Sequence, residues 1–584
     1  ARLNTALTRG KSSIQIGVIH PIESFWLSFG PSDQTGAVRT QYDEDFENLI
    51  SWMLYGLLDF DFISEALLPG LCPEAGFPLA VGEMRYRTIV VPDCRTIRKT
   101  TFLRLEKFRE AGGRVIFMGG VPSYMDALPS GEPALLAKKC ETIPFNRVSL
   151  LQALEPERVL DIRFPNGRRS DNLIYQLRED GEGKWLFLCH VNRRRNRLDQ
   201  PENYRIRVKG KYNPILYDTL TGEIHPCPAE TVNQDTMILR DMYAEDSLLL
   251  YLEKGIPSAA PGKAASFFLQ RIGKLQDPVP FTLSEPNVLL LDRAEYSFDQ
   301  GEFHPAEEIL RVDNQFRKTL GYPSRMDHMM QPWAEKDPEP EDHLLALRYS
   351  IVSNEKVSGV KLAMERPESA IICLNGNLVE SAADGFFTDK AIRTLSLPDL
   401  EKGENRLLLK IPFGRRTNVE WCYLLGHFGV RVAGAYTWIE KAPEQLAFGD
   451  WVPQGLPFYT GNVTYQCPVT VKKEIRDAVL EIPHFSAPVL VVHLDGIRKG
   501  VLAFAPHRLC LGRLTTGRHR IDITAYGNRF NAFGTLHNAN DEYLWYGPDS
   551  YRTKGSQWTD SYLFHGMGIR TAPVLYERKK NPEE

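Results

Sequence analysis

The chain has 584 residues, and at roughly 100–200 residues per domain this length predicts three to five domains. Its 43% hydrophobic and 25% charged residues are typical of a globular protein, and 70 basic and 74 acidic residues, well mixed, leave a net charge of −4. This balance excludes a basic nucleic-acid-binding surface and an acidic tail, and no apolar run approaches the ~18 residues of a membrane span.

The N-terminal part of the chain alternates strands and helices. Residues 1–11 resemble the end of a helix, and we expect them to be the remnant of a preceding domain. Residues 12–155 form the α/β domain proper, because strand–helix–strand order with short connections implies right-handed crossovers and a flavodoxin-like parallel sheet. Its predicted elements are three apolar strands and two amphipathic helices, at 14–19, 88–92, 114–118, 46–57 and 102–111.

The next 120 residues, 156–275, have an all-β pattern. Short apolar runs recur between turn residues, for example at 184–190 and 247–252, which predicts a small β-sandwich. Proline, glycine, serine and alanine dominate residues 255–264, which are typical of a linker.

The last 300 residues contain a weak internal repeat. The first copy has an apolar strand ending in Asn375-Gly376, followed by a second strand at 406–411. The second copy has a similar strand ending in Asp495-Gly496, followed by a strand at 519–525. Asn-Gly and Asp-Gly are strong hairpin signals, so we predict two jelly-roll sandwiches, at 276–440 and 441–584.

Polar and aromatic residues directly follow the first predicted strand of the α/β domain. They are His20, Glu23 and Trp26. Ligands of open parallel sheets bind outside the carboxyl ends of the strands, which places these three side chains on the functional edge. The alternative is that they pack against a neighbouring domain. No G-x-G-x-x-G follows the strand, so a dinucleotide is not indicated.

The nine cysteines are scattered, and none lies in a C-x-x-C pair. Such thiols are typical of core residues in a reducing compartment, so we expect a cytoplasmic protein without a redox motif or zinc site. Cys94 follows a strand but lacks the flanking glycines of a nucleophile elbow, which favours a structural role. No cofactor is predicted; a calcium ion held by backbone carbonyls in a jelly roll stays open.

Aromatic residues alternate with polar ones near the C-terminus. A polyhydroxylated ligand could stack on the rings of Trp545 and Trp558 and bond the polar groups of Asn528 and His537. The alternative is a tightly packed sandwich edge or a seam between domains.

These C-terminal residues, together with 451–461 (WVPQGLPFYTG), resemble the sugar-binding jelly roll of family 2 glycoside hydrolases. Nearly the whole chain resembles the C-terminal half of large bacterial α-L-rhamnosidase-like hydrolases, in which a catalytic (β/α)₈ barrel precedes a flavodoxin-like domain and β-sandwiches. The segment from Pro92 to Pro122 is similar to that flavodoxin-like domain and to the trimerisation domain of some β-galactosidases.

The resemblance implies an accessory, carbohydrate-binding and scaffolding part of a glycoside hydrolase acting on plant or host glycans. Its partners would be an oligosaccharide or glycoside and the barrel of the same parent protein, and neither nucleic acid nor a membrane. Because the family's catalytic acids belong to the barrel, no catalytic residue is carried over to this chain. A purely structural docking module and a self-sufficient enzyme with a site on the α/β domain are the alternatives.

Overall fold

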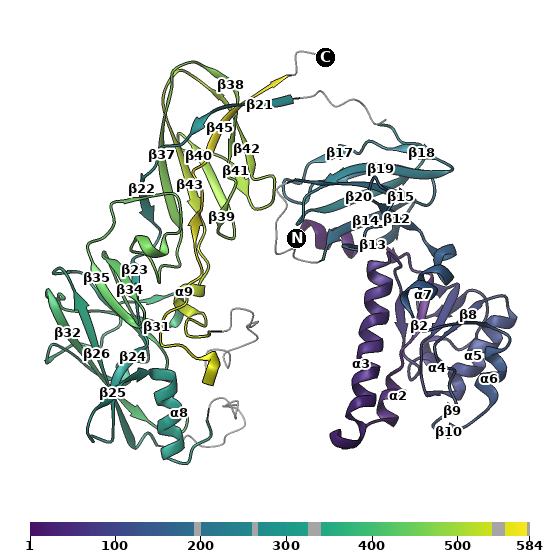
Figure 1. Ribbon diagram of the computed structural model, residues 1–584, viewed down its shortest axis with the longest axis horizontal. Coiled ribbons are helices and arrows are strands. Elements are labelled where there is room, and N and C mark those ends of the chain that lie inside the picture. Colours follow the sequence, from purple (N-terminus) through teal and green to yellow (C-terminus); the bar gives the residue numbers. More distant parts are fainter. Residues whose placement is uncertain (192–199, 260–266, 325–339, 418, 540–554, 581–584) are drawn as a thin grey trace. The chain divides into compact units, whose positions relative to one another are not determined.

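The computed structural model describes residues 1–191, 200–259, 267–324, 340–417, 419–539 and 555–580. The chain divides into two units, one of residues 1–264 with 504–506 and the other of residues 265–503 with 507–584. The first unit contains a parallel α/β domain and a β-sandwich, and the second contains two further β-sandwiches (Figure 1). This multidomain architecture confirms the predicted fold class.

A five-stranded parallel sheet forms the centre of the α/β domain. Its strand order is β11-β8-β6-β2-β3, which is 2-1-3-4-5 when the five strands are numbered along the chain, the flavodoxin order. The three predicted strands are confirmed as β2, β6 and β8, and all are almost fully buried, as expected of a parallel sheet covered on both faces. The five strands are β2 (Ile16–Ile19), β3 (Asp61–Ile63), β6 (Thr88–Val91), β8 (Arg114–Met118) and β11 (Glu141–Ile143).

Both predicted helices of this domain form. In α5 (Lys99–Glu110) the buried residues include Phe102, Leu105 and Phe108, and the helix ends where Gly112 adopts a φ of 97°. The other, α3 (Ser32–Tyr55), begins well before the predicted residue 46. The sequence pattern missed its first half because those residues are polar and exposed and carry no apolar stripe. In Figure 1 the long α3 lies alongside the sheet.

The small sandwich follows in the same unit and packs one core between two antiparallel sheets. Its first sheet also contains β1 (Lys11–Ser12), which pairs with β13. Lys11, predicted in the remnant, and Ser12, predicted in the α/β domain, thus both pair with the sandwich. The preceding α1 (Arg2–Leu7) packs through Leu3 and Ala6 near Trp185. The other strands are β13 (Leu173–Asp180), β14 (Gly183–His190), β20 (Ser247–Lys254), β16 (Tyr212–Tyr217) and β17 (Ile224–Pro226), then β12 (Leu160–Arg163), β15 (Glu202–Val208), β19 (Asp235–Met242) and β18 (Glu230–Val232).

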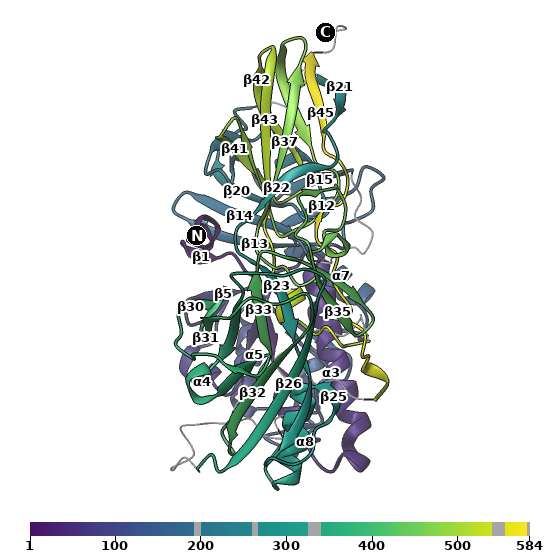
Figure 2. The ribbon, with the colours of Figure 1, turned by 90° about the vertical axis from the view of Figure 1, so that its left-hand side faces the viewer.

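The last sandwich is assembled from two separate parts of the chain. Strand β21 (Phe267–Lys274) pairs with β45 (Val574–Lys580), beside which it lies in Figures 1 and 2. Strand β22 (Val279–Leu283) pairs with β37 (Val463–Val471). Residues 267–283 therefore belong with the C-terminal domain, whereas the sequence placed them on either side of a boundary at 275. The middle sandwich is inserted between the two parts.

The middle sandwich is built from two sheets around one core. Its first sheet contains β23 (Asn287–Leu291), β33 (Cys422–Gly426), β27 (Lys361–Glu365), β31 (Asp389–Ser396) and β30 (Gly385–Phe387). Its second contains β25 (His304–Glu308), β24 (Arg293–Phe298), β26 (His343–Ser353), β32 (Gly403–Phe413), β28 (Ile371–Leu374) and β29 (Asn377–Leu378), extended by β34 (Gly429–Ala433) and β35 (Tyr436–Glu440). Helix α8 (Ile309–Thr319) packs against this sheet through β24 and β25.

Both predicted hairpins form, and they are equivalent. Strands β28 and β29 are joined by Asn375-Gly376, and β40 (Leu490–Leu494) and β41 (Ile497–Leu502) by Asp495-Gly496, with positive φ at all four turn residues. In each copy the first strand of the hairpin then pairs with a later strand of the chain, β32 in one and β43 (Gly517–Ala525) in the other. The repeat is therefore visible in the structure.

The core of the last sandwich takes up much of its aromatic content. Trp451 and Tyr459, from the segment that resembles the sugar-binding jelly roll, are fully buried there with Tyr465. These rings pack the interior and present no face to a ligand. The remaining strands are β38 (Ile475–Glu481), β42 (Arg508–Leu514), the short β36 (Gln445–Leu446) and the pair β39 (Phe485–Ser486) and β44 (Gly568–Ile569).

Candidate functional site

A cavity of about 180 Å³ lies at the carboxyl edge of the parallel sheet. The chain leaves β2 toward β3 on one side and returns to β6 on the other, so the strand order reverses between β2 and β6. This reversal opens a crevice, and it is where open α/β sheets bind their ligands. His20, directly after β2, and Asp93, soon after β6, both line the cavity, which confirms that the segment after the first strand lies on this edge.

Aromatic rings form much of the cavity wall. Phe46 comes from α3, Phe25 from the short α2 (Ile22–Leu27), and Phe145 from the loop after β11. The His20 ring meets Phe46 edge-on, with centroids 5.3 Å apart, and burial lowers the pKa of this imidazole. A neutral His20 is thus packed into an apolar corner. The complete lining is His20, Pro21, Ile22, Phe25, Tyr42, Asp43, Asp45, Phe46, Leu49, Pro92, Asp93 and Phe145.

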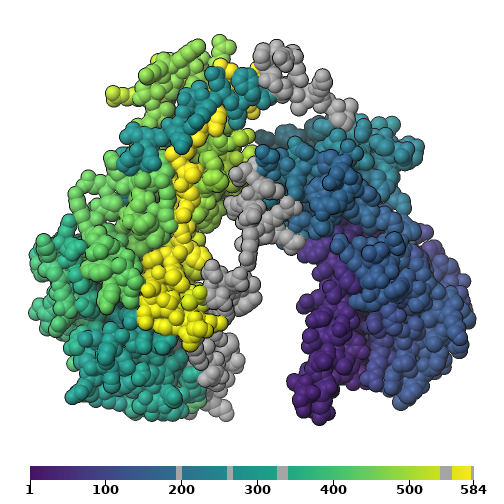
Figure 3. All heavy atoms as spheres, viewed as in Figure 1, coloured from purple at the N-terminus to yellow at the C-terminus, as the bar shows by residue number. Residues whose placement is uncertain are grey.

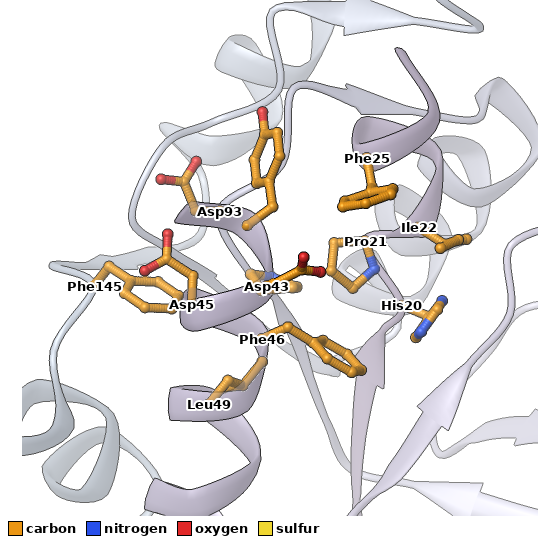
Figure 4. Close-up of a pocket in the computed structure, with 12 residues that line it drawn as sticks. His20, Pro21, Ile22, Phe25, Asp43, Asp45, Phe46, Leu49, Asp93 and Phe145 are labelled. Carbon is orange, nitrogen blue, oxygen red and sulfur yellow. The ribbon is translucent and has the colours of Figure 1, made fainter. Parts of the chain in front are cut away.

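Three aspartates supply the polar part of the wall. Asp43 and Asp45 project from the middle of α3, and Asp93 follows β6 (Figure 4). Burial raises the pKa of Asp93, a hydrogen bond with the Gly120 backbone opposes that change, and the charge of Asp45 adds to it. Asp45 and Asp93 therefore lie close enough to repel each other, and the cavity carries negative charge.

The two glycines after β8 make room for Asp93. A Cβ on Gly120 would lie 2.5 Å from the carboxylate oxygen Oδ1 of Asp93, and one on Gly119 would lie 3.0 Å from its Cβ and 3.2 Å from that of Phe145. Gly119 also has a φ of 85°, in the region that favours glycine. The ends of three neighbouring strands, β2, β6 and β8, thus shape this site together.

Beside the cavity, charged residues tie α2 to the sheet. Glu23 forms an ion pair with Arg98, whose backbone N–H donates to Glu65 Oε2 at 2.8 Å. Burial raises the pKa of Glu65 to about 7, despite that hydrogen bond. Ser24 Oγ accepts from the backbone N–H of Arg95 at 2.9 Å. The Glu23 carboxylate is therefore engaged within the domain. Its predicted roles, in ligand binding or in packing against a neighbouring domain, stay predictions.

Trp26, on the same helix as Glu23, is 60% exposed and does not line the cavity. Leu27 and Phe29 are exposed next to it, so α2 presents an apolar surface.

Cys94, which follows β6, differs from Trp26 in its exposure. It is buried, and burial together with the charges of Glu65 and Asp93 raises the pKa of its thiol far above the usual value, which supports a structural role.

In the second unit, two of the predicted site residues come together. The rings of His537 and Trp558 stack with centroids 4.9 Å apart, and the guanidinium of Arg311 lies 4.3 Å from the centre of the Trp558 ring. His537 is only 3% exposed: its Nδ1 bonds the Thr559 carbonyl oxygen and its Nε2 bonds Asp292 Oδ2, each at 2.9 Å. Since both partners are acceptors, both ring nitrogens carry hydrogen. This geometry matches the packed-seam alternative.

The seam contains a second buried carboxylate, Glu308. Its Oε1 accepts from Trp421 Nε1 at 2.7 Å, and its Oε2 accepts from the backbone N–H of Arg311 at the start of α8. Burial raises the pKa of Glu308 to about 7. The other oxygen of Asp292 accepts from the Tyr562 hydroxyl at 2.6 Å. Protein donors occupy all four carboxylate oxygens of Asp292 and Glu308, and each residue is only 1% exposed. These two carboxylates therefore have no face for a substrate.

The remaining predicted residues do not join this cluster. Asn528 accepts a hydrogen bond from the Phe530 backbone N–H at 3.0 Å and donates to the sulfur of Met567 at 3.5 Å. Trp545 lies outside the described residues. The structure thus brings His537 and Trp558 together, leaves Asn528 in its own turn, and tests the sugar-binding role of none of them.

Within the described ranges, no three side chains of His, Cys, Asp or Glu are arranged to hold a metal ion. The calcium considered above, which would use backbone carbonyls, stays a prediction. Among the helices of the described residues, none has both the length and the apolar character needed to cross a membrane.

Comparison with solved structures finds similarity to glycoside hydrolases, whereas no protein family and no curated protein matches the sequence. A rhamnosidase from Novosphingobium sp. PP1Y aligns with 89% of this chain at 11% identity and a TM-score of 0.41. An exo-carrageenase from Bacteroides ovatus aligns with 41% of the chain at 12% identity and a TM-score of 0.27. A β-galactosidase from Bacillus circulans sp. alkalophilus aligns with 42% at 12% identity and a TM-score of 0.29.

The chain covers less than half of each of these proteins. It spans 36% of the rhamnosidase, 29% of the exo-carrageenase and 42% of the β-galactosidase.

Proposed function

We propose that this chain is the accessory, non-barrel portion of a glycoside hydrolase of the α-L-rhamnosidase-like kind, which grips glycans and holds domains together. The observation that carries the proposal is the order of its domains. A flavodoxin-ordered sheet followed by three β-sandwiches is the series that the sequence resemblance implies after the catalytic barrel. The bond-breaking acids would then belong to the barrel.

Two features of the described residues support a glycan contact. The carboxyl edge of the sheet carries an open cavity walled by aromatic rings and carboxylates, and Trp26 beside it is exposed. Aromatic faces stack on the C–H faces of sugars, and carboxylates accept hydrogen bonds from hydroxyls. In the second unit, Trp558 is one of the predicted glycan contacts that the structure describes, and it is half-buried.

Affinity electrophoresis of the full chain in gels containing plant and host glycans tests the proposal. The wild-type protein should be retarded by at least one glycan, and Trp26→Ala or Trp558→Ala should reduce that retardation. Leu128→Ala, which removes a 70% exposed apolar side chain elsewhere on the α/β domain, is the matched control and should leave mobility unchanged.

A purely structural module is the second candidate, and the seam favours it. The sequence predicted His537 as a ligand-binding residue, but its side chain bonds Asp292 and so helps to hold two sandwiches together. A chain that migrates identically in every glycan gel, yet binds a separately expressed barrel in gel filtration, would be such a module.

A further inference from the structure

The cavity at the carboxyl edge of the parallel sheet is lined by both carboxylates and aromatic rings. Figure 4 shows Asp45 and Asp93 near Phe145 on one side and Phe25 on the other, with Asp43 between them and Phe46 beneath. A ligand that fits this wall must present hydrogen-bond donors to the carboxylates and an apolar surface to the rings. Ring-shaped polyols have both, because their hydroxyls point outward from a ring with C–H faces.

The charge of the lining selects against anions. Among the described residues that line the cavity there are three aspartates and no lysine or arginine. Arg95 lies near Tyr42, but its guanidinium stacks on Tyr124, 5.0 Å from the ring centre, and bonds the Tyr124 hydroxyl at 3.4 Å. Sulfated, phosphorylated or uronic acid ligands would therefore meet uncompensated negative charge.

The volume of the cavity limits the size of the ligand. At about 180 Å³ it is somewhat larger than an engineered cavity of about 150 Å³ that binds benzene. One six-membered ring fills such a space, whereas an oligosaccharide would have to extend from its mouth. Leu49 and Pro92, both buried, form part of the cavity lining.

We propose that this cavity binds one neutral pyranose unit, the terminal residue of a glycan. The ring lies against Phe25 and Phe46, and its hydroxyls donate to Asp45 and Asp93, whose mutual repulsion the bound donors reduce. The sugar class rests on the proposed function, whereas the selection against anions rests on the lining alone. The α/β domain would thus be a glycan-binding module in its own right.

Saturation-transfer NMR on the full chain tests this site, with L-rhamnose and D-galactose as neutral probes and D-glucuronate as the anionic one. At least one neutral sugar should receive saturation, and glucuronate should not. Asp45→Asn with Asp93→Asn should weaken neutral-sugar binding at least about tenfold, because two charged acceptors are lost. Glu44→Gln with Glu47→Gln removes two exposed carboxylates from the same helix without touching the lining, and should leave binding unchanged.

The inference is overturned if glucuronate binds as well as the neutral sugars, if neither neutral sugar binds, or if the Asp45/Asp93 double variant binds like wild type. The variant should melt no lower than wild type, since it removes a like-charge contact, so loss of binding is not loss of folding. Retardation in glycan gels that persists in this double variant would remove the cavity as the site while leaving the accessory role intact.

Discussion

His537 and Asp292, 245 residues apart in sequence, form a buried ion pair at 2.9 Å between the two sandwiches of the second unit. The C-terminal segment that carries His537 lies against the middle sandwich, where Figure 3 shows yellow atoms over teal and green ones. The Tyr562 hydroxyl bonds the other oxygen of the same carboxylate. The pair therefore fixes the inserted sandwich to the domain into which it is inserted.

Replacing His537 by Gln should lower the free energy of unfolding of the second unit by about 3 kcal/mol, because Asp292 is left as an uncompensated buried charge. Urea unfolding followed by near-UV circular dichroism measures this loss. His484→Gln alters an exposed histidine of the same unit and should be neutral. Equal stabilities for the two variants would show that the pair does not hold the seam.

The contribution of His537 should also depend on pH. Burial lowers the pKa of His537, but the hydrogen bond and charge of Asp292 outweigh this and raise it above the usual value. The stabilisation is thus fully present below about pH 6.5, the pKa of an unfolded histidine, and is lost as pH rises through the raised value. The difference in unfolding free energy between wild type and His537→Gln should shrink from pH 6 to pH 9. A difference that grows over this range would contradict the ion pair.

Glu65 should give the first unit a pH dependence of the same sign, because its folded pKa is also raised. Its pKa rises to about 7 in the folded protein, against about 4.3 for an unfolded glutamate. The folded state therefore keeps a proton that the unfolded state releases, and stability falls between these two pH values by up to about 4 kcal/mol. Glu65→Gln should reduce that fall in urea titrations at pH 5 and 8 without removing it, because burial also raises the pKa of Asp59 to about 7. The exposed control Glu110→Gln should leave the fall unchanged. A wild-type stability that rises with pH in this range would refute the assignment.

Gly120→Ala should disturb Asp93 and destabilise the α/β domain by about 1–3 kcal/mol, since the added Cβ would lie 2.5 Å from the carboxylate oxygen. Gly131→Ala places a methyl group in open space at a negative φ and is the control. Differential scanning calorimetry compares the two melting temperatures. If both variants melt with wild type, the glycines do not position Asp93.

Local sequence patterns predicted the elements whose side chains are buried in the core of a single domain. Strands β2, β6 and β8 are continuous apolar runs, and the Asn375-Gly376 and Asp495-Gly496 turns require a backbone that few other residues adopt. The first half of α3 was missed because a polar, exposed helix has no apolar stripe. The pairing of β21 with β45 was missed because sequence shows no partner some 300 residues away.

The candidate site was only partly predictable for the same reason. His20 and Glu23 were placed on the functional edge because a strand end is visible in sequence. Asp43 and Asp45 look like ordinary surface acids until the strand order brings α3 over the end of β6. His537 looked like a ligand-binding residue, and only its distance to Asp292 shows that the protein itself occupies its nitrogens.

The central claim, that this chain grips glycans while the catalytic acids lie elsewhere, is most directly tested by isothermal titration calorimetry of the full chain with a panel of oligosaccharides and aryl glycosides. Binding releases heat that stops when the sites are filled, whereas turnover sustains a heat flow for as long as substrate remains. We expect a saturable signal with at least one glycan and a return to baseline each time. A sustained heat flow with any glycoside, or no heat with the entire panel, would contradict the account.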